Sequence, residues 1–194
     1  MEPNPPAGGQ KPKSPMDKEV SAGIIIFRRT GEGPKFLLLY MGGAYWNFPK
    51  GKLEREERAL EAAFREIHEE TSIFKQNLRL LRGFSVYDKY VYTRNRRKIA
   101  KTVIFYLAET RRKEIRLPVR SGPGETHEGY AWVRYAEGMK MLNHENLRRN
   151  LKRAYDFIRH ARRPHAPAGQ PVEKQNPPAG GGGARGEGAV ASGQ

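Results

Sequence analysis

The sequence has no cysteine, which excludes a disulfide scaffold, thiol catalysis, and any zinc or iron–sulfur site with cysteine ligands. Its longest unbroken apolar run, Phe36 to Met41, is far shorter than the roughly 20 residues that span a bilayer. The N-terminal residues contain no apolar stretch typical of a signal peptide. These absences predict a cytoplasmic protein that does not associate with membranes.

Acidic residues are few compared with basic ones. The 194 residues include 21 Asp and Glu against 36 Lys and Arg, which gives a formal net charge of +15. An excess of this size favours a polyanionic partner or substrate, such as nucleic acid, a nucleotide polyphosphate or an inositol phosphate.

Apolar side chains are nearly absent from both ends of the chain. Residues 1–17 hold five prolines and two glycines, and residues 164–194 hold five prolines and eight glycines. Such segments bury too little apolar surface to offset the entropy lost on ordering, so we predict two disordered tails. The predicted folded domain is 18–163.

Changes of hydrophobic period divide this domain into strands and helices. Residues 20–27, 36–41, 78–88, 89–93, 101–109 and 130–135 are the predicted strands. Apolar residues at helical spacing predict a helix over 56–71, and a second helix is expected between an Asn143 cap and Pro164. This order indicates an α+β fold with a mixed sheet layered between helices.

Three carboxylates share one face of the first predicted helix. Glu66, Glu69 and Glu70 are spaced i, i+3 and i+4, so they repel each other unless a cation lies among them. Mg²⁺ prefers oxygen ligands of this kind. Gly51 precedes the helix, where the lack of a Cβ lets the backbone approach a ligand. The pattern suggests a metal site, with a solvated acidic helix face as the alternative.

The wider spacing resembles the Nudix box, which reads Gly, five residues, Glu, seven residues, Arg-Glu-apolar-any-Glu-Glu-any-Gly-apolar. The matching residues are Gly51, Glu57, Arg65, Glu66, Ile67, Glu69, Glu70 and Ile73. Ser72 stands where the box has its last glycine. We expect a left-handed backbone there, at a cost of about 1 kcal/mol for serine.

Segments around the box resemble the diadenosine tetraphosphate hydrolase branch of this superfamily. They are residues 22–28, 46–51, 101–109 and 127–132, within a likeness that covers about 20–160. The resemblance implies the Nudix fold and a Mg²⁺-dependent pyrophosphohydrolase, with Mn²⁺ as a second suitable ion. The substrate would be a nucleoside diphosphate linked to another group, above all a dinucleoside polyphosphate.

The resemblance also implies roles for single residues. Glu66, Glu69, Glu70 and the Gly51 carbonyl would bind the metal, while Glu57 and Arg65 would pair and brace the loop against the helix. The general base is left open among Glu66, Glu125 and Glu128, because Thr126 occupies the position where the branch has a glutamate. The expected substrate contacts are Lys50, Lys52, Tyr90, Lys101 and Phe105.

The segment 89–101 adds six Lys and Arg residues and no acid. Residues 94–98 predict an exposed hairpin tip, and Tyr87, Tyr90 and Tyr92 could stack on a base while the cations hold phosphates. A solvated edge hairpin is the alternative.

Several functions therefore remain open at this point. They are hydrolysis of dinucleoside polyphosphates, RNA 5′-ends, nucleoside triphosphates or diphosphoinositol polyphosphates, and RNA binding without catalysis. The intact carboxylates argue against the last. We expect a monomer or weak dimer.

Overall fold

The computed structural model describes residues 16–41, 45–117 and 127–160. Their strands are β1 (Asp17–Thr30), β2 (Gly33–Met41), β3 (Tyr45–Asn47), β4 (Lys50–Lys52), β5 (Leu78–Leu80), β6 (Val86–Arg94), β7 (Arg97–Thr110) and β8 (His127–Arg134). Their helices are α1 (Ala59–Thr71), α2 (Tyr135–Met141) and α3 (Glu145–His160), with a 3₁₀ turn at Lys75–Asn77.

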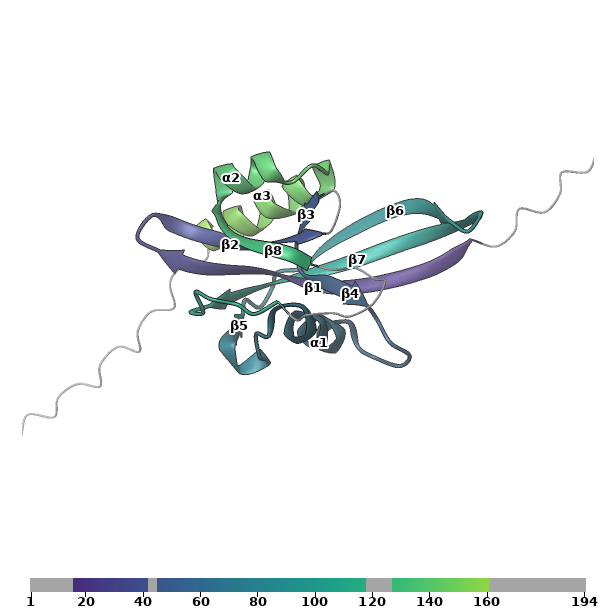
Figure 1. Cartoon of the computed structure of the whole chain (residues 1–194), viewed down its shortest axis with the longest axis horizontal. Helices are drawn as coiled ribbons and strands as arrows, with labels where there is room; N and C mark the ends of the chain where they lie inside the picture. The colour runs from purple at the N-terminus through teal and green to yellow at the C-terminus, as the bar shows by residue number, and fades with distance from the viewer. Residues whose placement is uncertain (1–15, 42–44, 118–126, 161–194) are drawn as a thin grey trace, which may run out of the picture. The chain divides into compact units, whose positions relative to one another are not determined.

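The strands join in one mixed sheet whose path is β3-β2-β1-β7-β5, with β4, β6 and β8 pairing with β1, β7 and β2. The long strands β1 and β7 run parallel, whereas β2, β4, β6 and β8 pair antiparallel with their neighbours. Beyond the edge of the helices, β6 and β7 continue as a hairpin beside the start of β1 (Figure 1).

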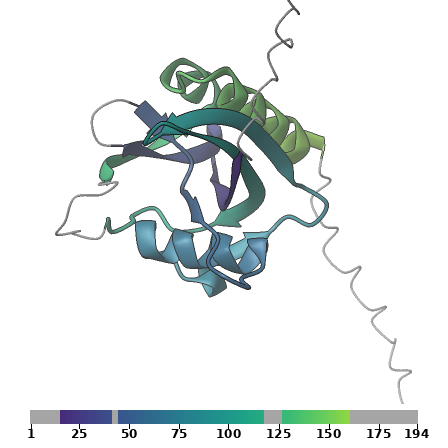
Figure 2. The same ribbon diagram turned by 90° about the vertical axis from the view of Figure 1, so that its right-hand side faces the viewer.

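The alternation of apolar side chains places helices on both faces of this sheet. Ile24 and Ile26 of β1 belong to the core beneath α1, whereas Ile25 and Phe27 belong to the core beneath α3. Successive strand residues point to opposite faces, so a continuous apolar run such as this one indicates a strand buried on both sides. Figures 1 and 2 show α1 below the sheet, and α2 and α3 above it. The predicted α+β fold, with a mixed sheet between helices, is confirmed.

Three predicted boundaries were wrong. Helix α1 begins at Ala59 rather than residue 56, because Glu56 has a φ of 64° and cannot continue a helix. The predicted strand 78–88 is two strands, interrupted where Gly83 adopts a φ of 83°. The folded domain begins at least one residue before 18, since Asp17 already pairs with Ile99.

The second half of the domain also differs from the prediction. Helix α2 was missed: it has only seven residues and lies between a strand and the longer α3. Helix α3 begins at Glu145, and Arg148 N donates to His144 O, so His144 rather than Asn143 is the residue at the helix start. Trp132 is only partly buried, and its Nε1 donates to Lys113 O.

The predicted tails 1–17 and 164–194 lie almost entirely outside the described residues, as do Pro164 and the loop 118–126 that contains Glu125 and Thr126. Among the described helices, none is long and apolar enough to cross a membrane.

Ser72 confirms the expected end of α1. Its φ of 55° and ψ of 22° are left-handed, and its N–H donates to His68 O. We predict that Ser72→Gly raises the unfolding free energy by about 0.5–1 kcal/mol, because glycine adopts this conformation without strain. The melting temperature should rise by about 2–4 °C in calorimetry. Ser85→Gly, at an exposed position without positive φ, is the control and should stabilise nothing. An equal rise in both variants would contradict this account.

Candidate active site

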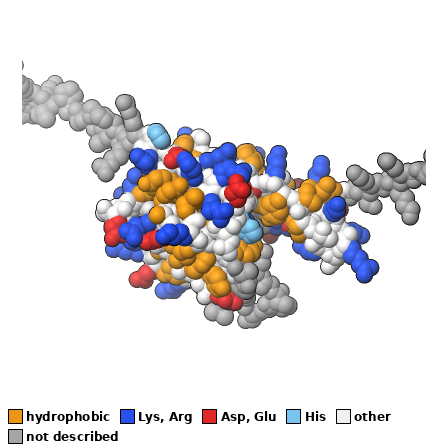
Figure 3. Space-filling view, turned by 90° about the horizontal axis from the view of Figure 1, so that it is seen from above, with side chains coloured by type: hydrophobic (Ala, Val, Ile, Leu, Met, Phe, Trp, Pro, Cys, Tyr) orange, Lys and Arg blue, Asp and Glu red, His pale blue; other side chains and the backbone are white. Residues whose placement is uncertain are grey.

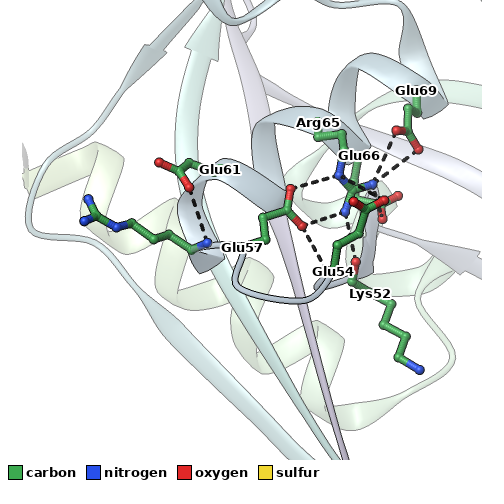
Figure 4. A network of polar contacts seen from close by, with 8 residues as sticks. Lys52, Glu54, Glu57, Glu61, Arg65, Glu66 and Glu69 are labelled. Atoms are coloured by element: carbon green, nitrogen blue, oxygen red, sulfur yellow. Dashed lines mark hydrogen bonds and ion pairs between the residues drawn. The ribbon is translucent and has the colours of Figure 1, made fainter.

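Arg65 is the centre of the polar network at the start of α1 (Figure 4). Its Nε and Nη2 donate to the two carboxylate oxygens of Glu57, each at 2.9 Å. Nη2 also donates to Lys52 O at 3.0 Å, which ties β4 to the helix. Nη1 donates to Glu66 at 2.9 Å and more loosely to Glu69 at 3.3 Å. The predicted bracing of the loop against the helix by Glu57 and Arg65 has this geometry in the structure.

The network shifts the pKa values of Glu57 and Arg65 in opposite directions. The guanidinium of Arg65 and the backbone N–H of Glu54 lower the pKa of Glu57, and the carboxylate of Glu57, followed by that of Glu66, raises the pKa of Arg65. Glu57 can occupy this place because it lies outside the helix, in the turn that Glu56 allows with its positive φ. Helix α1 therefore begins later than predicted because Glu57 lies in the turn that lets it pair with Arg65.

Glu66 and Glu70 reach the segment that enters β4. Both are buried, and Glu70 Oε2 accepts a hydrogen bond from Lys50 N at 2.9 Å. A Cβ on Gly51 would lie 1.9 Å from the carboxyl carbon of Glu66. Glycine is thus required at this position for the close approach of the Glu66 carboxylate to the main chain.

The carboxylates Glu66, Glu69 and Glu70 supply the hard oxygen donors that suit Mg²⁺ or Mn²⁺. As they stand, within the described ranges, no three acidic or histidine side chains are gathered into a set that could hold an ion. Glu66 and Glu69 instead share the Nη1 of Arg65. The donor chemistry therefore fits a divalent cation, and the side chains that turn toward Arg65 would have to turn toward the ion.

A pocket of about 530 Å³ opens between the sheet and the start of α3. Its lining residues are Tyr45, Asn47, Lys50, Asp88, Lys89, Tyr90, Val103, Phe105, His144, Asn146 and Leu147. The structure thus brings together three of the predicted substrate contacts, Lys50, Tyr90 and Phe105. The pocket and the carboxylate helix meet at Lys50, whose main chain binds Glu70.

The other two predicted contacts lie elsewhere, around the buried carboxylate of Glu19. Lys101 donates to it through a short hydrogen bond, Lys52 Nζ lies at 3.5 Å, and Arg94 Nη2 lies at 3.4 Å. Burial by itself would raise the pKa of Glu19, but Lys101 and then Lys52 outweigh it, so this pKa is lowered. The side chains of Lys52, Arg94 and Lys101 thus share the single carboxylate of Glu19. The roles of Lys52 and Lys101 as phosphate contacts remain predictions.

The basic hairpin has the predicted exposed tip. Asn95 and Arg96 have φ values of 51° and 62°, which correspond to the two-residue turn that suits the twist of paired strands. Figure 3, a view from the side of α2 and α3, shows Lys and Arg side chains over this face and at the end of the hairpin. Tyr90 and Tyr92 lie on one face of β6, and Tyr87 lies on the other. The three rings therefore do not form one stack.

Five polar or aromatic pocket residues were not singled out from the sequence: Tyr45, Asn47, Asp88, His144 and Asn146. One of them left a local signal, because Asp88 lies two residues after the buried Val86, on the same inward face of β6, where an apolar residue would be expected. Glu128, a candidate base, is exposed at the start of β8 and is not among the pocket residues. Glu125, the other loop candidate, lies outside the described residues.

Residues 17–155 match the NUDIX domain model, which covers the sheet, the carboxylate helix and most of α3. The chain belongs to the Nudix family. The predicted resemblance is confirmed, and so is the prediction of an enzyme, a Nudix hydrolase of the pyrophosphohydrolase class.

Similar proteins agree with this assignment. The chain is 32% identical over 146 residues to the asymmetrical bis(5′-nucleosyl)-tetraphosphatases of Rattus norvegicus and Mus musculus, an overlap of 71% of this chain and 94% of each relative. The Caenorhabditis elegans Ap4A hydrolase, in a binary complex, superimposes with a TM-score of 0.61 at 23% identity, over 73% of this chain and 98% of that one. At that identity, the superposition supports the fold alone.

We predict that Glu57→Gln lowers the unfolding free energy at neutral pH by about 1–3 kcal/mol, because it removes a charge-assisted bidentate pair. Since the folded-state pKa of Glu57 is lowered, this stabilisation is complete above its ordinary pKa and is lost as the pH falls through the folded-state value. Melting curves of both proteins between about pH 7 and pH 3 should therefore converge at the acidic end. Glu54→Gln, at an exposed side chain 4.0 Å from Arg65 Nε, is the control. Parallel curves would overturn the assignment.

Proposed function

We propose that this Nudix hydrolase cleaves dinucleoside polyphosphates such as diadenosine tetraphosphate, with the help of a divalent cation. The observation that carries the proposal is the position of Lys50. Its side chain lines the pocket, and its backbone N–H binds Glu70 on the carboxylate helix. A base in the pocket would thus have its phosphates directed toward the box glutamates. The 32% identical tetraphosphatases support the same substrate class.

The roles of the chain's own residues follow from this arrangement. Tyr45 and Tyr90 offer aromatic surface to a nucleobase, Phe105 is a buried part of the pocket wall, and Lys50 offers a cation to the phosphates. Glu66, Glu69 and Glu70, with the Gly51 carbonyl, would hold Mg²⁺ or Mn²⁺. Such an ion, when bound, neutralises charge on phosphate oxygens and lowers the pKa of bound water. Arg65 holds Glu66 and Glu69 through hydrogen bonds from its Nη1.

Hydrolysis also needs a base that removes a proton from the attacking water. Glu66 is the candidate nearest to the pocket segment, since its carboxylate lies against Gly51, next to Lys50. Glu128 is the alternative on β8. The pH dependence of kcat for Glu66→Gln and Glu128→Gln distinguishes them, because only loss of the base removes the acidic limb of the profile.

A substrate panel tests the proposal on the full chain. Diadenosine tetraphosphate, a nucleoside triphosphate, 5′-triphosphorylated RNA and a diphosphoinositol polyphosphate are incubated with Mg²⁺, with Mn²⁺, or with EDTA, and the products are separated by chromatography. We expect cation-dependent hydrolysis with the highest kcat/KM for diadenosine tetraphosphate. A higher value for another member of the panel would reject the proposed substrate class, and full activity in EDTA would reject the cation.

We predict that Glu69→Gln lowers kcat by about two to four orders of magnitude, since it removes one charged oxygen donor of the proposed metal site. The fold should persist, because Glu69 is partly exposed and its bonds to Arg65 are long. Glu61→Gln, on the same helix but exposed outside the network of the box glutamates, is the matched control and should retain its kcat. Turnover near that of the wild type in a folded Glu69→Gln protein would remove Glu69 from the site.

A second variant tests whether the tip of the β6–β7 hairpin, residues 94–98, binds RNA. The exposed cations Arg94, Arg96, Arg97 and Lys98 are replaced together by glutamine. Only a long polyanion can reach both the pocket and the tip, so KM for triphosphorylated RNA should rise while KM for diadenosine tetraphosphate changes little. The salt slope for a single strand should fall by about 0.7 per lost phosphate contact. Unchanged KM and salt slope on RNA would leave the tip as a solvated edge.

A further inference from the structure

One buried acid in the pocket has no part in the metal chemistry described so far. Asp88 lies on β6 opposite Val103, is only 6% exposed, and lines the pocket beside Phe105. Its neighbours along the strand, Tyr87 and Lys89, are exposed, and Lys89 is also one of the lining residues of the pocket. A carboxylate therefore occupies an inward position that the alternation of the strand would give to an apolar side chain.

The partners of Asp88 are two amides one helical turn apart on α3. Asn150 Nδ2 donates to Oδ1 at 2.8 Å, and Asn146 Nδ2 donates to Oδ2 at 2.9 Å. Within the part of the chain that the structure describes, no Lys or Arg side chain forms an ion pair with Asp88, although Arg149 and Arg153 contribute favourable charge from the same helix. Burial raises the pKa of Asp88 despite these partners. The carboxylate is costly to keep at this position, which is typical of functional rather than structural sites.

The hydrogen-bonding capacity of Asp88 is only half used. Each carboxylate oxygen can accept about two hydrogen bonds, and each receives one from an asparagine. The asparagines thus fix the carboxylate and leave acceptor capacity at the wall of the pocket. A ligand that meets this wall must offer a hydrogen-bond donor, which on the edge of a nucleobase is an N–H group, because a carbonyl oxygen would face a negative charge.

We propose that Asp88 is a specificity-determining residue, which accepts a hydrogen bond from the exocyclic amino group of the nucleobase in this pocket. The inference rests on the proposed function, since it takes the pocket to be the base site of a nucleotide substrate. The aromatic rings of Tyr45 and Tyr90 recognise any flat base, whereas Asp88 distinguishes bases by their amino groups. Adenine or guanine is favoured over the same ring system without the amino group.

Two pairs of substrates isolate this contact. Dinucleoside tetraphosphates of adenine and of unsubstituted purine differ only in the 6-amino group, and those of guanine and hypoxanthine differ only in the 2-amino group. In the wild-type enzyme, KM should be about 10-fold or more lower for the amino-bearing member of at least one pair, as expected for a hydrogen bond to a charged group. The values of kcat should remain similar, since the contact is distant from the phosphates.

Asp88→Asn replaces one acceptor oxygen with a donor at constant size. It should raise KM for the amino-bearing substrate and reduce the ratio within that pair to about one, with kcat retained. If Asp88→Asn fails to fold, the preference of the wild-type enzyme within each substrate pair still tests the inference, because equal KM values within both pairs would contradict it. Asp156→Asn, an exposed acid of α3 that binds Lys152, is the matched control and should change neither KM nor the ratio.

Binding without turnover separates this inference from the substrate proposal. With EDTA present, calorimetry compares ADP with purine riboside 5′-diphosphate on the wild type, and GDP with inosine 5′-diphosphate. If dinucleoside tetraphosphates are not hydrolysed but the amino-bearing nucleotide binds more tightly and loses this advantage in Asp88→Asn, the substrate proposal fails and the role of Asp88 stands. If the wild type shows no preference within either pair, or folded Asp88→Asn keeps it, the role of Asp88 is wrong.

Discussion

The site depends on how the five N–H donors of one guanidinium are distributed. Arg65 gives two to Glu57, one to the carbonyl of Lys52, and the rest to Glu66 and Glu69. Through these bonds one side chain joins the turn before α1, the strand β4 and two of the three box carboxylates. Because the fork is rigid and always charged, it holds these groups in fixed positions, and it lowers the pKa of Glu57.

This arrangement also explains how like charges can gather on a helix without unfolding it. Glu66, Glu69 and Glu70 would repel each other on an isolated helix. In the folded chain, Arg65 offsets part of that repulsion, and the backbone N–H of Lys50 binds the oxygen of Glu70. The carboxylates are thus stabilised by hydrogen bonds that a divalent cation could replace in part. Under the proposed function, these carboxylates would thus be held in place before a cation binds, and they could still bind it.

The sequence was most informative where chemistry is local. The spacing of Gly51, Glu57 and the helix glutamates predicted the family and the bracing pair, and the position of Ser72 predicted a left-handed residue, all of which depend on one helix and its ends. The pocket was not predictable in the same way. Asp88 and Asn146 are 58 positions apart and meet only because α3 packs across β6. Lys101 fits the phosphate-contact pattern in sequence, yet the parallel register of β1 and β7 places Glu19 opposite it.

Residues 45–51 connect the pocket with the box carboxylates, because they contact the core beneath α3 on one face of the sheet and helix α1 on the other. Phe48 packs edge-on against Phe105 at 5.6 Å between ring centroids, in the core beneath α3, whereas the backbone of Lys50 and Gly51 meets Glu70 and Glu66 of α1 on the opposite face. A displacement of this segment would move the pocket wall and the carboxylates together. Under the proposed function, the fold would determine the distance between a bound base and the hydrolysed phosphate, since both sites adjoin the same short stretch of main chain. Selectivity for the base and selectivity for the cleaved bond therefore need not reside in the same side chains, and Asp88 can specify one while the box glutamates specify the other.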